Sequence, residues 1–153
     1  MQSTNGYKSL QIIFFALLCG QVLFLLIVFF LINQNVLNAA RHELDNIFLP
    51  LLVILTLICM VSGNKIFKGR LQKLATVNPI SARFSEYRAA SLIRWALLEG
   101  PCIFAIICFM LTFNYLFMLI AILILFFFGS TAPSKNKVAA DMGISVDDLD
   151  SIS

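Results

Sequence analysis

The chain has 153 residues, of which 60% are hydrophobic and 12% are charged, and its formal net charge is +3. Its mean hydropathy is +0.93. Soluble domains contain about 45–50% apolar and about 25% charged residues, so this composition excludes an ordinary soluble globular domain. We therefore expect an integral membrane protein. The apolar stretches are continuous and do not alternate with polar residues, which predicts membrane-spanning helices and not a barrel.

Four apolar stretches predict four transmembrane helices, at about residues 10–32, 47–65, 90–111 and 114–130. A helix needs about 20 residues to cross the hydrocarbon core, and the first and third stretches meet that length. The first stretch exceeds the about 7–15 residues of a signal-peptide core, so we interpret it as a retained span. The expected fold is all-α and polytopic, with antiparallel hairpins over 1–132 and a tail over 133–153.

Basic residues lie almost entirely on one side of the predicted spans. Outside the spans, Arg41 is the one basic residue between the first and second spans. The others lie in the N-terminal segment, in the loop 65–90 and in the tail. Because cytoplasmic segments are enriched in Lys and Arg, we expect both termini and this loop to be cytoplasmic. The expected location is the inner (cytoplasmic) membrane, as a multi-pass protein.

The basic segment 65–90 contains helical patterns at both of its ends. The stretch NKIFKGRLQKLA can continue the second span as a helix, Asn78-Pro79 predicts a turn, and a helix from Ser81 enters the third span. Basic and aromatic side chains suit anionic lipid headgroups or a protein partner. A simpler interpretation is that they set topology and anchor the span ends. The expected lipid- or partner-facing residues are Lys65, Lys68, Arg70, Lys73, Arg83, Arg88, Arg94 and Trp95.

The tail differs in character from the apolar region. Pro133 predicts the start of a short helix that runs through Met142, and Gly143 predicts its end. The stretch SVDDLDSIS that follows is acidic and polar. We interpret this stretch as disordered, with a docking peptide for a basic partner as the alternative.

Glu99 is the one ionisable side chain deep in the apolar stretches, about 12 Å along the third span from Ser91. An ionised carboxyl group facing lipid is costly, so we expect it to face other helices, to be protonated or to contact water. Gly100 permits close helix approach, and Pro101 frees the carbonyl group of Leu97, which predicts a polar break in the helix. The expected partners at similar depth are Gln21 and Thr56. Three interpretations stay open: an ion-binding site, a structural contact between helices, and a misplaced span.

Part of the chain resembles the helical hairpin of rotary ATP synthase c-subunits. The resemblance covers GNKIFKGRLQKLATVNPISARFSEYRAASLIRWALLEGPCIFAIICF, with Val77-Asn78-Pro79 in the loop, then Glu99, then Ile103-Phe104-Ala105. It implies that Glu99 carries a proton. The whole chain resembles the short four-span membrane proteins of Bacteroidetes-type bacteria, which implies the fold and no activity.

We recognise no enzyme motif in the sequence. His42 is the single histidine, and the four cysteines lie inside apolar stretches, so neither a metal site nor a disulfide framework is expected. The basic loop is explained by topology and does not indicate nucleic-acid binding. We expect no cofactor and no catalytic activity.

These features favour a non-catalytic assembly or accessory subunit in the lipid bilayer, in a homo-oligomer or a larger membrane complex. The alternative is a proton-translocating element that uses Glu99 in a homo-oligomer. A third and weaker hypothesis is a small-substrate transporter built as an oligomer, because four spans rarely enclose a pathway alone.

Overall fold

The computed structural model describes residues 6–34, 36, 42–74, 77, 79–147 and 149. The elements in chain order are α1 (Gly6–Asn33), the 3-10 helix η1 (His42–Leu44), α2 (Asp45–Leu74), α3 (Ile80–Thr112), α4 (Tyr115–Ser130) and α5 (Lys135–Met142). Every element in the described part of the chain is helical, so the all-α prediction is confirmed. Arg41 and Asn78 lie outside the described residues.

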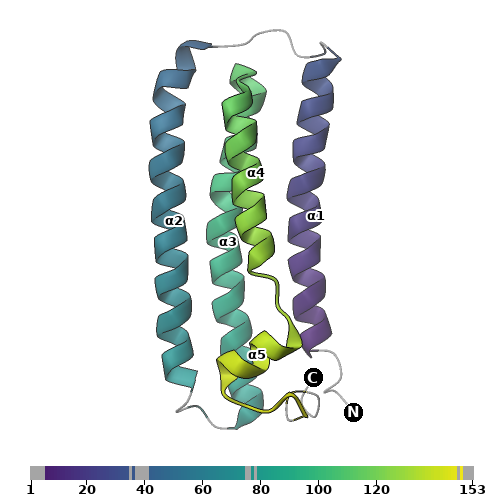
Figure 1. The fold of residues 1–153 in the computed structure, drawn as a ribbon, viewed down its shortest axis with the longest axis vertical. Coiled ribbons are helices and arrows are strands. Elements are labelled where there is room, and N and C mark those ends of the chain that lie inside the picture. The colour runs from purple at the N-terminus through teal and green to yellow at the C-terminus, as the bar shows by residue number, and fades with distance from the viewer. Residues whose placement is uncertain are drawn as a thin grey trace.

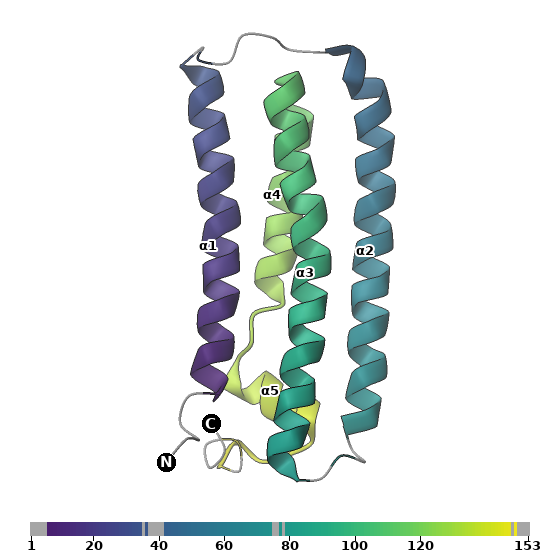
Figure 2. The same ribbon diagram turned by 180° about the vertical axis from the view of Figure 1, so that it is seen from behind.

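The long helices stand side by side with α3 in the centre of the bundle (Figures 1 and 2). Helix α3 packs against α1, α2 and α4, while α4 also contacts α1. Figure 1 shows α4 on one face of α3, and α5 folded across the end of the bundle where α1 begins. Helix α2 ends and α3 begins at this same end, which we call the basal end. It corresponds to the side that the sequence predicts to be cytoplasmic.

Three helices are long and apolar enough to cross a membrane: α1 with 28 residues, α2 with 30 and α3 with 33. Helix α4 has 16 residues. At about 1.5 Å per residue it measures about 24 Å, which is shorter than a hydrocarbon core of about 30 Å. Helices α4 and α5 pass as one span only when taken together, and a bend of 68° separates them. The structure thus supports three spans and a shorter apolar helix.

The basic segment between the second and third spans is largely helical, as the sequence predicts. Helix α2 continues to Leu74, and α3 begins at Ile80. Arg70 and Lys73 therefore lie on a helix that continues directly from an apolar span.

The predicted break at Gly100 and Pro101 is wrong, because α3 continues through both residues to Thr112. Proline removes one backbone donor, but neighbouring helices allow membrane helices to tolerate it. Pro101 and the adjacent Cys102 are buried against the rest of the bundle. Both residues therefore lie on the buried face of a helix that continues past them.

The core divides into two clusters of buried side chains along the bundle axis. The basal cluster includes Phe14 of α1, Trp95 of α3 and Phe128 of α4. The ring centroid of Phe14 lies 5.1 Å from that of Trp95 and 5.1 Å from that of Phe128. The distal cluster includes Leu25, Val28, Leu52, Cys102, Ala105, Ile106, Phe109, Phe117, Ala121 and Ile124. Both clusters contain residues of α1, α2, α3 and α4, and they lie at two depths of the bundle.

Helix α5 folds onto the basal end. The sequence predicted that this helix starts at Pro133, but it starts at Lys135. Ser134 is its N-cap and accepts a hydrogen bond from the Lys137 amide at 3.3 Å. The carbonyl group of Pro133 instead accepts a bond from the Tyr7 hydroxyl at 3.0 Å. The helix ends at Gly143, as predicted, in a left-handed conformation with φ of 66°. Glycine adopts this conformation without steric strain because it lacks a Cβ atom.

One residue of the acidic stretch after α5 is packed. Leu149 is buried in the basal cluster together with Val138, Ala139 and Met142 of α5. The expectation of disorder is therefore wrong for Leu149, whereas Ser145, Val146 and Asp147 before it are exposed.

The α3–α4 connection is the tight turn that the sequence predicts. Phe113 adopts a left-handed conformation with φ of 56°, and Asn114 caps α4 by accepting a bond from the Leu116 amide at 3.0 Å. The Asn114 amide group donates to Asp45 Oδ2 at 2.9 Å, which joins this turn to the start of α2.

Replacing Asn114 with alanine removes both of these bonds. We expect Asn114→Ala to lower the free energy of unfolding by about 1–2 kcal/mol. Thermal unfolding in detergent, followed by circular dichroism, measures this change. Asn46→Ala is the control, because Asn46 is an exposed residue in the first turn of α2. Equal stability of the two variants would contradict a capping role for Asn114.

Candidate functional site

Glu99 lies close to the middle of the apolar part of α3. It is about 14 Å from residue 90, where the predicted span begins, in a hydrocarbon core of about 30 Å. Its side chain is partly buried. Among the described residues we find neither a hydrogen bond nor an ion pair for its carboxyl group. The helix therefore presents a carboxyl group at mid-depth without a partner in the described chain.

The residues that follow Glu99 lie on two different faces of α3, one exposed and one buried. Gly100 is exposed, and a Cβ atom added to it would meet no atom within 4 Å. Pro101 and Cys102 are buried. Gly100 therefore does not serve the close approach between helices that we expected within the bundle. Gly100 lies on the outer face of α3, whereas Glu99 lies partly buried between that face and the buried one.

Gln21 lies on the inner face of α1, between the two core clusters. It is 2% exposed, and neither its amide nitrogen nor its amide oxygen has a hydrogen-bond partner. Along α1 the basal cluster reaches Leu18, and the distal cluster starts again at Phe24. Along α3 the clusters meet between Leu98 and Cys102. Gln21 thus lies at the depth of Glu99, as the sequence predicted.

Thr56 lies on a different side of the bundle from the inner face of α1. Its hydroxyl group donates to the carbonyl group of Leu52 in its own helix at 2.7 Å. The residue lines a groove of about 390 Å³ between α2 and α4, whose wall is otherwise formed mainly by apolar residues of α4. Thr56 is therefore bonded locally and faces this groove.

The predicted ion-binding set is not joined by hydrogen bonds within the described chain. Glu99 has no bond, Gln21 has none, and Thr56 bonds only to its own backbone. Glu99 and Gln21 share a depth, whereas Thr56 lies beside α4. The arrangement contains two polar side chains that lack partners at one level of an apolar bundle.

The predicted basic surface lies at the basal end, and its residues differ in exposure and in the contacts that they make. Lys65, Lys68 and Lys73 are exposed. Arg70 forms an ion pair with Glu86 at 3.6 Å between nitrogen and oxygen. Arg88 is partly buried. The exposure of the three lysines is compatible with a surface among headgroups, and Arg70 and Arg88 are less exposed than the lysines.

Arg83 binds backbone carbonyl groups at the basal end. It donates to the Val77 carbonyl at 3.2 and 3.3 Å, and to the Met142 carbonyl at 3.4 Å. Met142 is the last residue of α5, where helix carbonyl groups lack internal donors and a cation is favoured. Arg83 therefore links the α2–α3 turn to the end of α5, a role that the sequence prediction missed.

Trp95 does not belong to the lipid- or partner-facing surface, so that prediction is wrong. It is 2% exposed and packs against Phe14 in the basal cluster. The sequence placed it at the interface because tryptophan is enriched at span ends, but its position on the helix turns it inward.

Arg94 is partly buried between α3 and α2. Its Cγ atom lies 3.7 Å from the position of a Cβ atom on Gly63, and its guanidinium carbon lies 5.0 Å from the centroid of the Phe67 ring. Phe67 is one turn nearer the basal end than Gly63, so the side chain extends towards that end. This direction fits the prediction that Arg94 reaches towards the membrane surface and does not pair with Glu99.

The sequence prediction also missed the contact between Tyr87 and α5. The Tyr87 hydroxyl group donates to Asp141 Oδ2 at 3.3 Å. Both residues lie in segments that the sequence assigned to helices, but no pattern in either segment indicates that they meet. Only the fold of α5 back over the bundle brings them together.

No family model matches the chain, and no curated protein or solved structure matches it either. The resemblances to the c-subunit hairpin and to short four-span membrane proteins therefore stay predictions.

The buried amide group of Gln21 gives a prediction about stability. An unpaired buried polar group costs about 1–3 kcal/mol, so we expect Gln21→Leu to raise the free energy of unfolding by that order. Thermal unfolding in detergent measures the change. Gln11→Leu is the matched control. We expect it to lower the free energy of unfolding, because the Gln11 amide donates a hydrogen bond to the Tyr7 hydroxyl at 2.7 Å. A loss of stability in Gln21→Leu would mean that this amide has a partner in the native assembly.

Proposed function

We propose that the protein is an integral membrane protein with four spans that acts as a non-catalytic assembly or accessory subunit. It works in a homo-oligomer or in a larger membrane complex. In the proposed topology the basal end and both termini face the cytoplasm, and the protein resides in the inner membrane. Helix α4 is the proposed fourth span, because local bilayer thinning accommodates a short apolar helix at modest cost.

The distribution of charge supports this orientation. Lys65, Lys68 and Lys73 are exposed at the basal end. The opposite end carries Glu43 in η1 and Asp45 at the start of α2. Basic residues near span ends favour the cytoplasmic side.

The observation that carries the proposal is the partly buried carboxyl group of Glu99 at mid-depth of α3, next to the exposed Gly100. Glu99 has no described partner there, and Gly100 beside it faces open space. A charged side chain facing hydrocarbon costs several kcal/mol, so a carboxyl group at this depth requires another polar group or another chain. A second protein chain that covers α3 at this depth satisfies that requirement.

The side chains around Glu99 suit close contact with another helix. Ala96 is exposed and precedes Gly100 by one helical turn. Pairs of small residues spaced in this way allow backbones to approach closely in membranes. A protonated Glu99 could then donate a hydrogen bond across the interface.

A bulky residue at Gly100 tests the proposed interface. We expect Gly100→Leu to weaken assembly by about 5-fold to 150-fold, because overpacking a helix contact costs about 1–3 kcal/mol. Gly20→Leu is the matched control: Gly20 is also exposed, in the apolar part of α1, and a Cβ atom there meets no atom within 4 Å. Sedimentation equilibrium in detergent measures self-association, and quantitative mass spectrometry after purification from native membranes measures other partners. If both variants assemble like the wild type, the interface is not on this face.

The alternative function is proton translocation through Glu99 in a homo-oligomer. The unpartnered amide of Gln21 at the same depth favours it, because a buried polar group near a carboxyl group can hold a water molecule. The measurement is proton flux into liposomes for the wild type and for Glu99→Gln. For an assembly subunit we expect no flux from either protein. Flux in the wild type that Glu99→Gln abolishes would overturn the non-catalytic assembly role in favour of translocation.

A further inference from the structure

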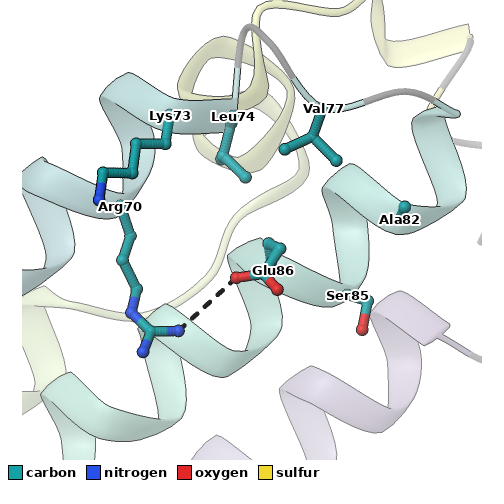
Figure 3. Close-up of a pocket in the computed structure, with 7 residues that line it drawn as sticks. All are labelled: Arg70, Lys73, Leu74, Val77, Ala82, Ser85 and Glu86. Carbon is teal, nitrogen blue, oxygen red and sulfur yellow. Dashed lines mark ion pairs between the residues drawn. The ribbon is translucent and has the colours of Figure 1, made fainter.

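A pocket of about 440 Å³ lies at the basal end, between the end of α2 and the start of α3 (Figure 3). Its residues come from both helices and from the turn between them: Arg70, Lys73, Leu74, Val77, Ala82, Ser85 and Glu86. Its size is in the range of about 300–1,000 Å³ that small-ligand sites occupy. The charged side chains are exposed, whereas Leu74 is buried at its floor.

The side of the pocket formed by Arg70, Ser85 and Glu86 lies at the level of phospholipid headgroups, and Lys73 lies about 4 Å farther out. Arg70 and Lys73 follow the predicted end of the second span at residue 65 by about 8–12 Å of helix. Ser85 and Glu86 precede the predicted start of the third span at residue 90 by about 6–8 Å. The headgroup region extends about 5–8 Å beyond each side of the hydrocarbon core. A headgroup can therefore enter the pocket while its acyl chains stay in the bilayer.

The charges of the pocket are of both signs and lie close together. Arg70 and Glu86 point towards each other in Figure 3, with 3.6 Å between Nη1 and the carboxyl oxygen. Their side chains are 42% and 56% exposed, and exposed pairs of this kind contribute little to stability. A ligand that supplies one charge to each partner can therefore replace the pair without a large loss.

We propose that this pocket binds the headgroup of a phosphatidylethanolamine-type phospholipid, a phosphate diester that carries a primary ammonium group. The phosphate pairs with Arg70 and Lys73, and the ammonium group donates to the carboxylate of Glu86. The apolar floor of Leu74, Val77 and Ala82 contacts the methylene groups of the headgroup. This site is separate from the outer face of α3, so it does not depend on the proposed assembly function.

The same charges discriminate between headgroups. A phosphatidylglycerol headgroup offers only its phosphate charge, which leaves Glu86 beside an anion. A phosphatidylcholine headgroup carries the right charges, but its ammonium group has no hydrogen to donate to a carboxylate. The ethanolamine headgroup alone of these three supplies both the charge and the donor.

Competition between lipids tests the proposal on the unaltered protein. The full chain is equilibrated with equal amounts of dioleoyl phosphatidylethanolamine, phosphatidylglycerol and phosphatidylcholine, and retained lipids are counted by native mass spectrometry. We expect about fivefold preferential retention of the ethanolamine lipid over each of the other two, the order expected of one exposed charge pair. Equal retention of the three lipids, or a preference for phosphatidylglycerol, would overturn the proposal.

Variants then assign the preference to the pocket. Glu86→Gln should remove the preference for the ethanolamine lipid over phosphatidylglycerol, whereas Arg70→Gln and Lys73→Gln should weaken retention of both. Lys65→Gln and Lys68→Gln are the controls, because both lysines are exposed on α2 and do not line the pocket. The pocket assignment fails if the control variants shift retention as much as the pocket variants, or if Glu86→Gln leaves the ratio of the two lipids unchanged.

Discussion

The bundle depends on the packing of α3, which contacts each of the other long helices. Of the most apolar window of α3, 50% is buried inside the bundle, against 11% for α2 and 22% for α1. Helix α2 is therefore held chiefly by its contact with α3, where Gly63 brings it against Leu97 and Arg94. Because lipid is as apolar as leucine, close packing and polar contacts hold such helices together, and not exclusion from water.

The same central position explains why polar groups concentrate on and around α3. Its inner face carries Trp95 and Cys102 in the two core clusters, Glu99 lies partly buried at the edge of that face, and Gly100 is exposed on the outer face. At the basal end it contributes Arg83, Tyr87 and Glu86 to contacts with the turn, with α5 and with α2. One helix thus links the apolar core, a polar level at mid-depth and the charged basal end.

The lengths of the apolar runs predicted the three long helices, because a helix that crosses a membrane needs about 20 mostly apolar residues. The short α3–α4 connection was predicted from the few residues between the third and fourth apolar stretches, and the end of α5 was predicted from Gly143. The direction in which Trp95 points was not predictable, because it depends on the rotation of α3 against α1. The continuity of α3 at Pro101 depends on the packing of its neighbours. The contacts of Arg83 and Tyr87 with α5 depend on how α5 folds back, for which the sequence holds no local signal.

The basal cluster joins residues from the two extremes of the described chain. Tyr7 and Leu10 of α1 pack in the same cluster as Val138, Met142 and Leu149. During synthesis α1 is made long before α5, so this part of the core stays incomplete until α5 has been made. Contacts between residues so distant in sequence form slowly, since the chain must first close a long loop. The distal cluster contains no residue of α5, so its packing does not wait for that helix.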